Sequence, residues 1–244
     1  GDGARAAAGG ARGAVLVQVR VRDGDVRFYA KPKAAYDKAQ TRRLSMSRVN
    51  LEAMIDVVDG KLPLVFDVER ASDILELIAF ADEQHVRIVV DGGREAWMVA
   101  SELARAKVPV ILEPMAMLPY AFDSLHARDD APAILAKAGV DVVFSGGGDL
   151  GTTRLRQEAG VAVANGMTHE AALRAITSSV ARAFGDDDIG TIAVGKRADL
   201  VAWSGDPFET TTAAALVLIG GEKMTLATRQ TELVRKYRTL PAAR

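Results

Sequence analysis

Four short apolar runs alternate with helix-like segments, and this alternation limits the fold of the chain more than any other feature. The runs are 62–68, 86–90, 108–112 and 140–144. Such runs are typical of strands covered on both faces. Helices are expected between them, one capped by Ser72 and the others over 95–106 and 131–138. The pattern predicts βαβ units and a parallel sheet, which fits a doubly wound sheet or a (β/α) barrel equally well.

The segments on either side of these units are less uniform. A short helix over 51–58 is expected before them, and helices over 153–164 and 168–184 after them, the second between Thr168 as N-cap and Gly185 as stop. Valines alternate with other residues over 14–29 and surround Asp23-Gly24, which locally indicates a β-hairpin, but the structure of 14–29 stays open between a hairpin and a helix. A helix is expected over 30–40.

The character of the chain changes near residue 188. Residues 190–203 predict two short strands around a turn, and 214–221 predicts a third strand that ends in Gly220-Gly221. We therefore expect two domains, 1–187 and 188–244.

Composition excludes several kinds of chemistry. Lysine and arginine (31) balance aspartate and glutamate (32), so no basic field favours a nucleic-acid partner. No cysteine is present, which excludes disulfides, thiolate nucleophiles and zinc–thiolate sites. No apolar run is long enough for a membrane span. The chain shows no secretory signal and begins with Gly1, so we expect a preceding segment to be missing and leave the compartment open between cytoplasm and periplasm.

The segment from Ala171 to Ile219 carries the most specific pattern, including G-T-I-A-V-G-K-R-A-D-L-V at 190–201. It resembles the end of the metal-dependent amidohydrolase superfamily, in particular the imidazolonepropionase-like amidohydrolases, where G-x-I-x-x-G-K-x-A-D-L-V leads from the last barrel helices into a small β-sandwich. The likeness extends over about 48–235, through V-F-D-V-E-R-A-S-D-I (65–74) and I-V-V-D-G-G-R-E-A-W (88–97). The resemblance implies an α/β fold: the second half of a TIM-like (β/α)8 barrel followed by part of a β-sandwich, without the early H-x-H strand.

Active relatives hold one or two divalent metals, usually zinc, at the carboxyl ends of the barrel strands. On this resemblance, Asp67 and Glu69 replace two histidines, Gly92 replaces a third, and Asp149 is the carboxylate nearest to the final aspartate ligand. The chain resembles a ligand-poor branch of the family, as does its ending at 228–233. We therefore expect no cofactor in this chain, with Asp67, Glu69 and Asp149 as weak metal candidates and no catalytic residue assigned.

Other polar residues have both functional and structural interpretations. Asp67 and Glu69 lie on one face of a strand and could hold Mg²⁺ or Ca²⁺, or could pair with a cation such as Arg70 or Arg94. The same alternatives apply to Asp91 and Glu113. Gly146-Gly147-Gly148 could hold an anion through backbone N–H groups, although a plain turn is favoured. The three histidines are best explained as surface residues; among His85, His126 and His169, only His126 lies in a loop at the carboxyl ends of the strands.

The resemblance implies hydrolysis of carbon–nitrogen bonds other than peptide bonds, but we expect this chain to lack the metal site and the activity. Two alternatives remain: a non-catalytic subunit or scaffold that pairs with a homologous amidohydrolase or self-associates, and a protein that binds a small ligand at the carboxylate-lined mouth.

Overall fold

The computed structural model describes residues 12–31, 42–147 and 151–238. The chain divides into two compact units, Gly1–Gly190 and Thr191–Arg244. Both α/β layering and a separate antiparallel sheet are present. Within the described residues, no helix combines the length and apolarity needed to span a membrane.

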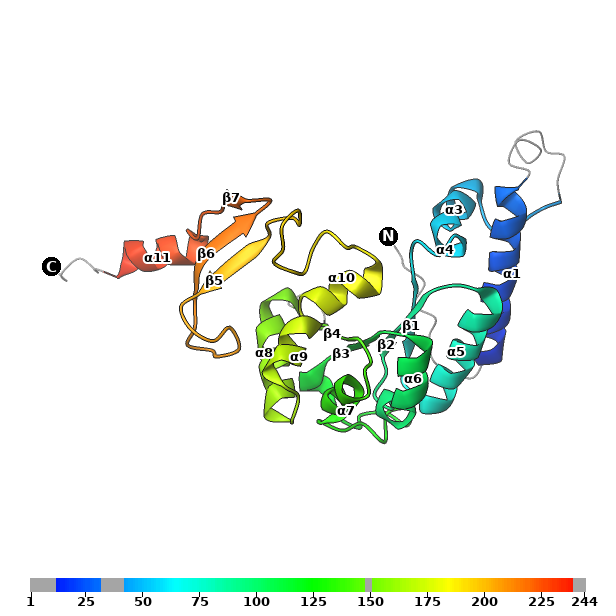
Figure 1. Cartoon of the computed structure of the whole chain (residues 1–244), viewed down its shortest axis with the longest axis horizontal. Helices are drawn as coiled ribbons and strands as arrows, with labels where there is room; N and C mark the ends of the chain where they lie inside the picture. Colours follow the sequence, from blue (N-terminus) through cyan, green and yellow to red (C-terminus); the bar gives the residue numbers. More distant parts are fainter. Residues whose placement is uncertain (1–11, 32–41, 148–150, 239–244) are drawn as a thin grey trace. The chain divides into compact units, whose positions relative to one another are not determined.

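A parallel four-stranded sheet forms the centre of the first unit (Figure 1). Its strands lie in sequence order: β1 (Leu64–Val68), β2 (Ile88–Gly92), β3 (Val110–Leu112) and β4 (Val142–Phe144). The four apolar runs are confirmed as strands, each beginning two residues later than the run itself. The parallel pairing places the carboxyl ends of all four strands at one edge.

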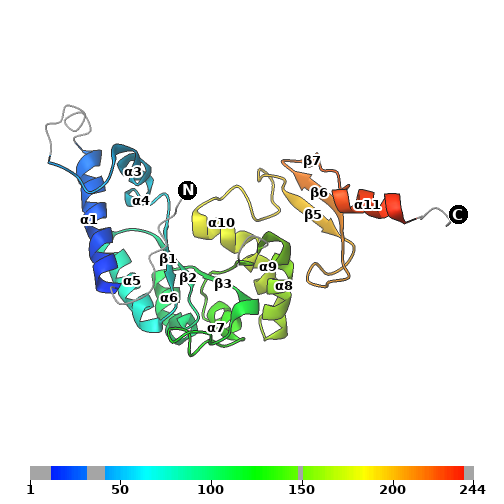
Figure 2. The same cartoon turned by 180° about the vertical axis from the view of Figure 1, so that it is seen from behind.

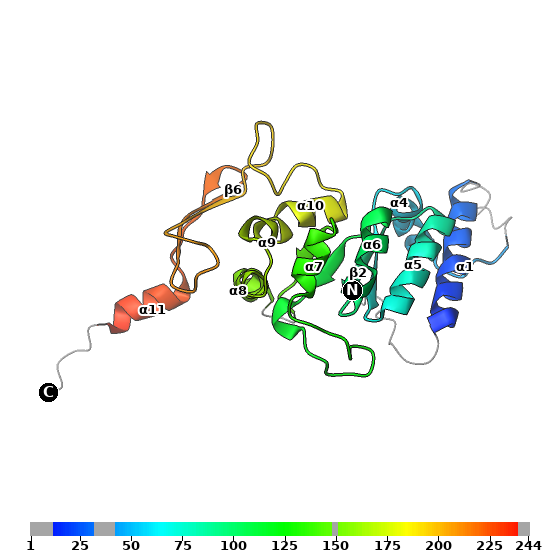
Figure 3. The ribbon, with the colours of Figure 1, turned by 60° about the horizontal axis from the view of Figure 1, so that its bottom comes forward.

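One face of the sheet is covered by the helices that connect the strands. These are α5 (Ala71–Gln84), the short 3₁₀ segment η1 (Ala96–Val99) with α6 (Ala100–Ala106), and α7 (Ala131–Lys137), which follow one another along the sheet in Figure 3. Phe66 of β1 meets Phe80 of α5 edge to face, with ring centroids 6.1 Å apart. The expected cap at Ser72 is wrong: α5 begins at Ala71 after Arg70, and the Ser72 hydroxyl bonds Asp73 instead.

The last helices of the unit are α8 (Gly151–Ala164), α9 (His169–Ala175) and α10 (Ser178–Phe184). The sheet register aligns Phe66 with Val90, Val110 and Val142. Val89 and Val143 are each one residue away from this row, so their side chains point to the opposite face of the sheet, where they pack with Ala183 of α10. The expected single helix over 168–184 is broken at Ile176 and Thr177. Thr168 is confirmed as the N-cap of α9, since its side chain accepts from the Ala171 N–H.

Residues 14–29, which the sequence left open between a hairpin and a helix, belong to a helix, α1 (Arg12–Ala30). Val26 and Tyr29 share one side of α1 and are fully buried with Leu44 and Leu51, the latter from α3 (Arg48–Ala53). The Tyr29 hydroxyl donates to Glu52 at 3.0 Å. Packing against α3 and α4 (Ile55–Val58) therefore overrides the local β pattern. Most of the helix expected over 30–40 falls outside the described residues.

The second unit holds a three-stranded antiparallel sheet, β5 (Leu200–Trp203), β6 (Ala214–Ile219) and β7 (Glu222–Lys223), followed by α11 (Arg229–Tyr237) (Figure 2). The strand predicted at 214–221 is confirmed, with its turn at Gly220-Gly221. The first strand predicted within 190–203 is wrong. Ile192 and Val194 lie in an irregular segment with exposed side chains, because no partner strand pairs with them among the described residues.

Candidate functional site at the carboxyl ends of the strands

The carboxyl edge of the parallel sheet, called the mouth below, brings together short polar segments that follow each strand. Glu69 follows β1, the turn Gly92-Gly93-Arg94-Glu95 closes β2, Glu113 follows β3 and Ser145 follows β4. The segment after β3, 113–130, continues from Glu113 to α7 and includes the 3₁₀ turn η2 (Pro114–Ala116). The mouth is thus built from residues that lie far apart in the sequence.

A buried ion pair lies at the centre of the mouth. The Arg94 guanidinium donates through Nη1 to Oε1 of Glu69, and the Arg94 backbone N–H donates to Oε2 at 3.0 Å. The two side chains are only 10% and 12% exposed. Both carboxylate oxygens of Glu69 are therefore occupied by one residue. The pairing of Glu69 with Arg94 was one of the alternatives that the sequence left open.

Arg94 is held from a second direction by segment 113–130. Its Nε donates to the Ala116 carbonyl at 3.3 Å, and its guanidinium lies 4.6 Å from the centre of the Tyr120 ring. Guanidinium suits this position because it presents several donors in one plane and stacks on aromatic rings. The sequence analysis missed Tyr120, which is 26 residues from Arg94 and belongs to no motif.

Two consecutive glycines make room for this ion pair. Gly92 has φ +90°, and a Cβ on it would lie 2.9 Å from Oε1 of Glu69. Gly93 has φ +50°, and a Cβ there would meet Val110 at 2.9 Å. Any side chain at Gly92 would thus need both a backbone conformation rare for L-residues and the space that Glu69 fills. At Gly92, where the resemblance places a histidine ligand, the backbone conformation and the contact with Glu69 therefore both require glycine.

Further acids surround the pair. Burial raises the pKa of Glu69 above its ordinary value, against the lowering effect of Arg94, and the charges of Asp67 and Asp123 raise it further. Tyr120 is 68% exposed, yet partial desolvation of its hydroxyl raises the pKa of Tyr120 against the lowering effect of Arg94, and Glu69, Asp123 and Asp67 act in the raising direction. These groups therefore share one electrostatic environment. Asp67 itself is exposed and is the next-to-last residue of β1.

His126, the histidine expected at the mouth, contacts a carboxylate. Its Nδ1 lies 2.8 Å from Oε1 of Glu95, whose other oxygen accepts from the Ala71 N–H at 3.2 Å at the start of α5. The His126 carbonyl accepts from the Trp97 indole at 2.9 Å. Glu95 is buried and thereby ties segment 113–130 to the first turn of α5. Sequence reasoning did not identify Glu95, because its partners are 24 and 31 residues away.

The remaining candidates lie toward β4. The Glu113 carboxylate lies against Gly147, where a Cβ would be 2.6 Å from Oε2, so the chain's own carboxylate fills the space beside this glycine. Glu158 of α8 is buried and accepts from the Met115 N–H at 2.7 Å; burial raises its pKa and Glu113 adds to the effect. Asp149 and Gly148 lie outside the described residues.

We tested whether these residues fit the divalent metal that the resemblance implies. A catalytic zinc needs three good protein ligands with supporting contacts. Both oxygens of Glu69 are bound by Arg94, Glu95 is engaged by His126 and Ala71, and Gly92 offers no side chain. Across residues 12–31, 42–147 and 151–238, no group of three or more potential ligands is assembled. The described donors do not fit a metal centre.

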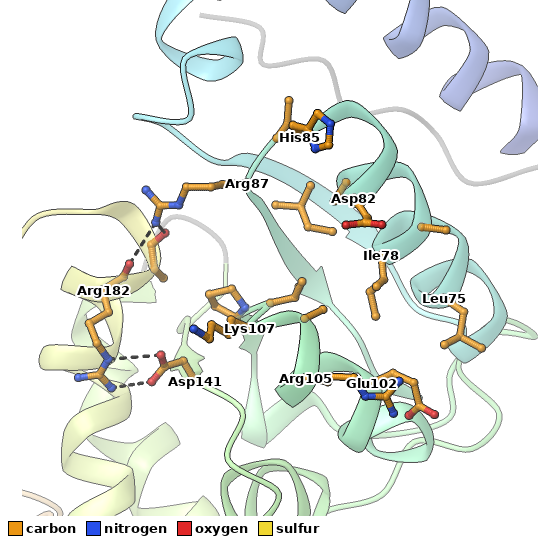
Figure 4. A pocket seen from close by; sticks show the side chains of 18 residues that line it. Leu75, Ile78, Asp82, His85, Arg87, Glu102, Arg105, Lys107, Asp141 and Arg182 are labelled. Carbon is orange, nitrogen blue, oxygen red and sulfur yellow. Dashed lines mark hydrogen bonds and ion pairs between the residues drawn. The ribbon is translucent and has the colours of Figure 1, made fainter.

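The opposite, amino-terminal edge of the sheet carries a groove of about 700 Å³ between α5, α6 and α10 (Figure 4). Arg87 donates there to the Lys61, Arg182 and Ala183 carbonyls, and Arg182 pairs with Asp141. His85 and Lys107 cap α5 and α6 in the left-handed conformation. Arg87 and Arg182 of this groove are thus engaged by carbonyl and carboxylate groups of the protein itself.

Comparison with known proteins agrees with the class that the fold and the sequence pattern indicate. The family model described as "Amidohydrolase family" matches residues 141–224. A crystal structure of an amidohydrolase from Thermotoga maritima MSB8 is similar at 28% identity and a TM-score of 0.74, over 86% of this chain and 55% of that chain. None of the curated proteins matches.

A mutant of the atrazine chlorohydrolase TrzN from Arthrobacter aurescens TC1, complexed with zinc and atraton, has a similar fold at 18% identity and a TM-score of 0.51. This likeness covers 77% of our chain and 50% of that chain. The chain spans about half the length of these solved structures. The resemblance to the metal-dependent amidohydrolase superfamily is therefore confirmed.

Proposed function

We propose that this chain is a non-hydrolytic member of the amidohydrolase superfamily, with the second half of a (β/α)8 barrel and an altered strand-end site. One observation carries the proposal: the carboxylate of Glu69, in the position of a metal ligand, is bound at both oxygens by Arg94. Metal-dependent hydrolysis needs a bound water with a lowered pKa, and that requires an open, well-ligated metal. Gly92 removes one of the ligands that the resemblance implies.

Metal content and turnover test this proposal together. After dialysis against zinc and washing, we expect the purified chain to retain well below one equivalent by elemental analysis. We also expect no turnover of N-acyl amino acids, dipeptides or cyclic amides. One retained equivalent, or hydrolysis that disappears in Asp67→Asn, would show that the chain builds a working site.

A second role, as a non-catalytic subunit or self-associating scaffold, is supported by the exposed strand β1. Among the described residues β1 pairs on one side only, with β2, and Val65, the second residue of this strand, is 48% exposed. An unpaired strand edge beside apolar surface favours association with another chain. A second copy or a homologous subunit that supplies a neighbouring strand would cover it.

Sedimentation velocity at micromolar concentration tests this second role. We expect wild type to self-associate and Val65→Lys to shift the population toward monomer. Leu75→Lys is the matched control, because Leu75 has a similar exposure of 42% but lies on helix α5, away from the strand edge. A monodisperse wild-type monomer with a single cooperative melting transition would contradict the scaffold role.

A further inference from the structure

Arg94 is a buried cation that lies among acids at the mouth. It binds Glu69 directly, and the charges of Asp67 and Asp123 reach both Glu69 and the Tyr120 hydroxyl. The neighbouring cation Arg70 is directed elsewhere, donating to the Phe122 carbonyl at 3.3 Å. Neither Asp67 nor Asp123 has a hydrogen bond or ion pair with any of the described residues. The Arg94–Glu69 pair therefore lies in surroundings to which two further acids add negative charge.

The contacts of Arg94 resemble the coordination of a bound ion more than a surface ion pair. The guanidinium is buried and has three contacts from two segments: the Glu69 carboxylate after β1, and the Ala116 carbonyl and the Tyr120 ring of segment 113–130. The turn that carries it needs Gly92 and Gly93, both at positive φ. Removing such a cation leaves a carboxylate desolvated and uncompensated, which is far more costly than losing an exposed pair.

We propose that Arg94 is a resident counter-cation that takes, at the mouth, the electrostatic place of a divalent ion, so that an added cation can substitute for it once the side chain is removed. The inference rests on the proposed function, because a mouth already filled by a tethered guanidinium needs no metal. Beyond that function, Arg94 is the residue that takes the place of the metal. Once its side chain is removed, the mouth would accept small planar cations or divalent cations.

Chemical rescue of Arg94→Ala tests the proposal at pH 8, where carboxylates are ionised. We expect the melting temperature to fall by about 10 °C. Low-millimolar guanidinium chloride or MgCl₂ should recover several degrees, more than NaCl of equal ionic strength, because binding to the folded state stabilises it. Wild type and the exposed-pair control Arg182→Ala should show no such recovery. A fall that no cation reverses beyond NaCl overturns the proposal, as does an unchanged melting temperature.

A second variant covers the case in which Arg94→Ala does not fold. The double variant Glu69→Gln/Arg94→Gln removes both charges, so we expect a folded chain that gains nothing from guanidinium or MgCl₂. A double variant that also fails to fold, or that still responds to cations, would overturn the inference. Zinc uptake by the wild type would instead overturn the proposed function.

Discussion

The two edges of the parallel sheet each hold an arginine–carboxylate pair, yet the pairs differ in burial. At the carboxyl edge, the Arg94 and Glu69 side chains are 10% and 12% exposed. At the amino-terminal edge, the Arg182 and Asp141 side chains are 47% and 40% exposed, with Nη2 to Oδ1 at 2.5 Å. Contact geometry alone therefore does not set how much an ion pair contributes to the free energy of unfolding. Desolvation makes removal of one partner costly at the mouth, whereas solvent can replace it at the other edge.

The largest effect is expected from Glu69→Ala, which leaves the Arg94 guanidinium buried without its carboxylate. We expect the free energy of unfolding to fall by about 3–5 kcal/mol in urea denaturation. The matching change at the other edge, Asp141→Ala, should cost about 1 kcal/mol or less. Equal losses at both sites would remove the distinction drawn between the two edges.

A smaller effect is expected from Gly92→Ala. Gly92 (φ +90°) and Gly139 (φ +89°) share a backbone conformation, but a Cβ at Gly92 meets Glu69, while a Cβ at Gly139 meets nothing within 4 Å. Each substitution should cost about 1–3 kcal/mol from backbone strain. We expect the loss to be larger at Gly92, and thermal denaturation of the two variants measures the difference. If Gly139→Ala loses as much, the Glu69 contact adds no constraint.

The pH dependence of stability reports on Glu69 separately. Burial raises the folded-state pKa of Glu69 above its ordinary value of 4.5. The contribution of the protonated Glu69 carboxyl to the free energy of unfolding is therefore fully present below about pH 4.5 and is lost as pH rises through the folded-state pKa. Relative to Glu69→Gln, wild type should lose stability as pH rises from 4.5 toward neutrality. Parallel stability profiles for the two proteins would show that burial does not shift this carboxyl group.

The smallest effect is expected from Arg182→Ala at the exposed edge. Its pair with Asp141 is solvated, although Arg182 also donates to the Ser179 hydroxyl at 3.1 Å. We expect a loss of about 0–1 kcal/mol that diminishes in 1 M NaCl, since salt screens exposed charges. A loss above that of Gly92→Ala would show that this pair, and not the buried one, holds the sheet together.

Local pattern was sufficient wherever one segment decided its own structure. The four strands were predicted within two residues, because each is an apolar run long enough to be buried on both faces whatever its neighbours. Thr168 and Gly185 were recognised as helix ends for a similar reason: caps act on backbone groups only a few residues away. The amidohydrolase pattern at 190–201 likewise needed no tertiary information.

The same local reasoning failed where partners are distant. The alternation at 14–29 left a hairpin and a helix open, and burial of Val26 and Tyr29 against Leu51 selects the helix. The segment around Ile192 has strand-like composition and no partner to pair with among the described residues. Strand formation depends on a neighbour, and a single sequence does not show whether one is present.

The mouth divides in the same way. The sequence by itself determined that Asp67 and Glu69 lie at a strand end and that Gly92 and Gly93 follow at the end of the next strand. Only the tertiary structure decided that Glu69 binds Arg94, that Tyr120 stacks on the guanidinium and that Glu95 holds His126. The physical reason is that parallel strands bring their ends together across 25 or more residues. Burial of the Arg94–Glu69 pair at these ends makes the loss of either partner costly.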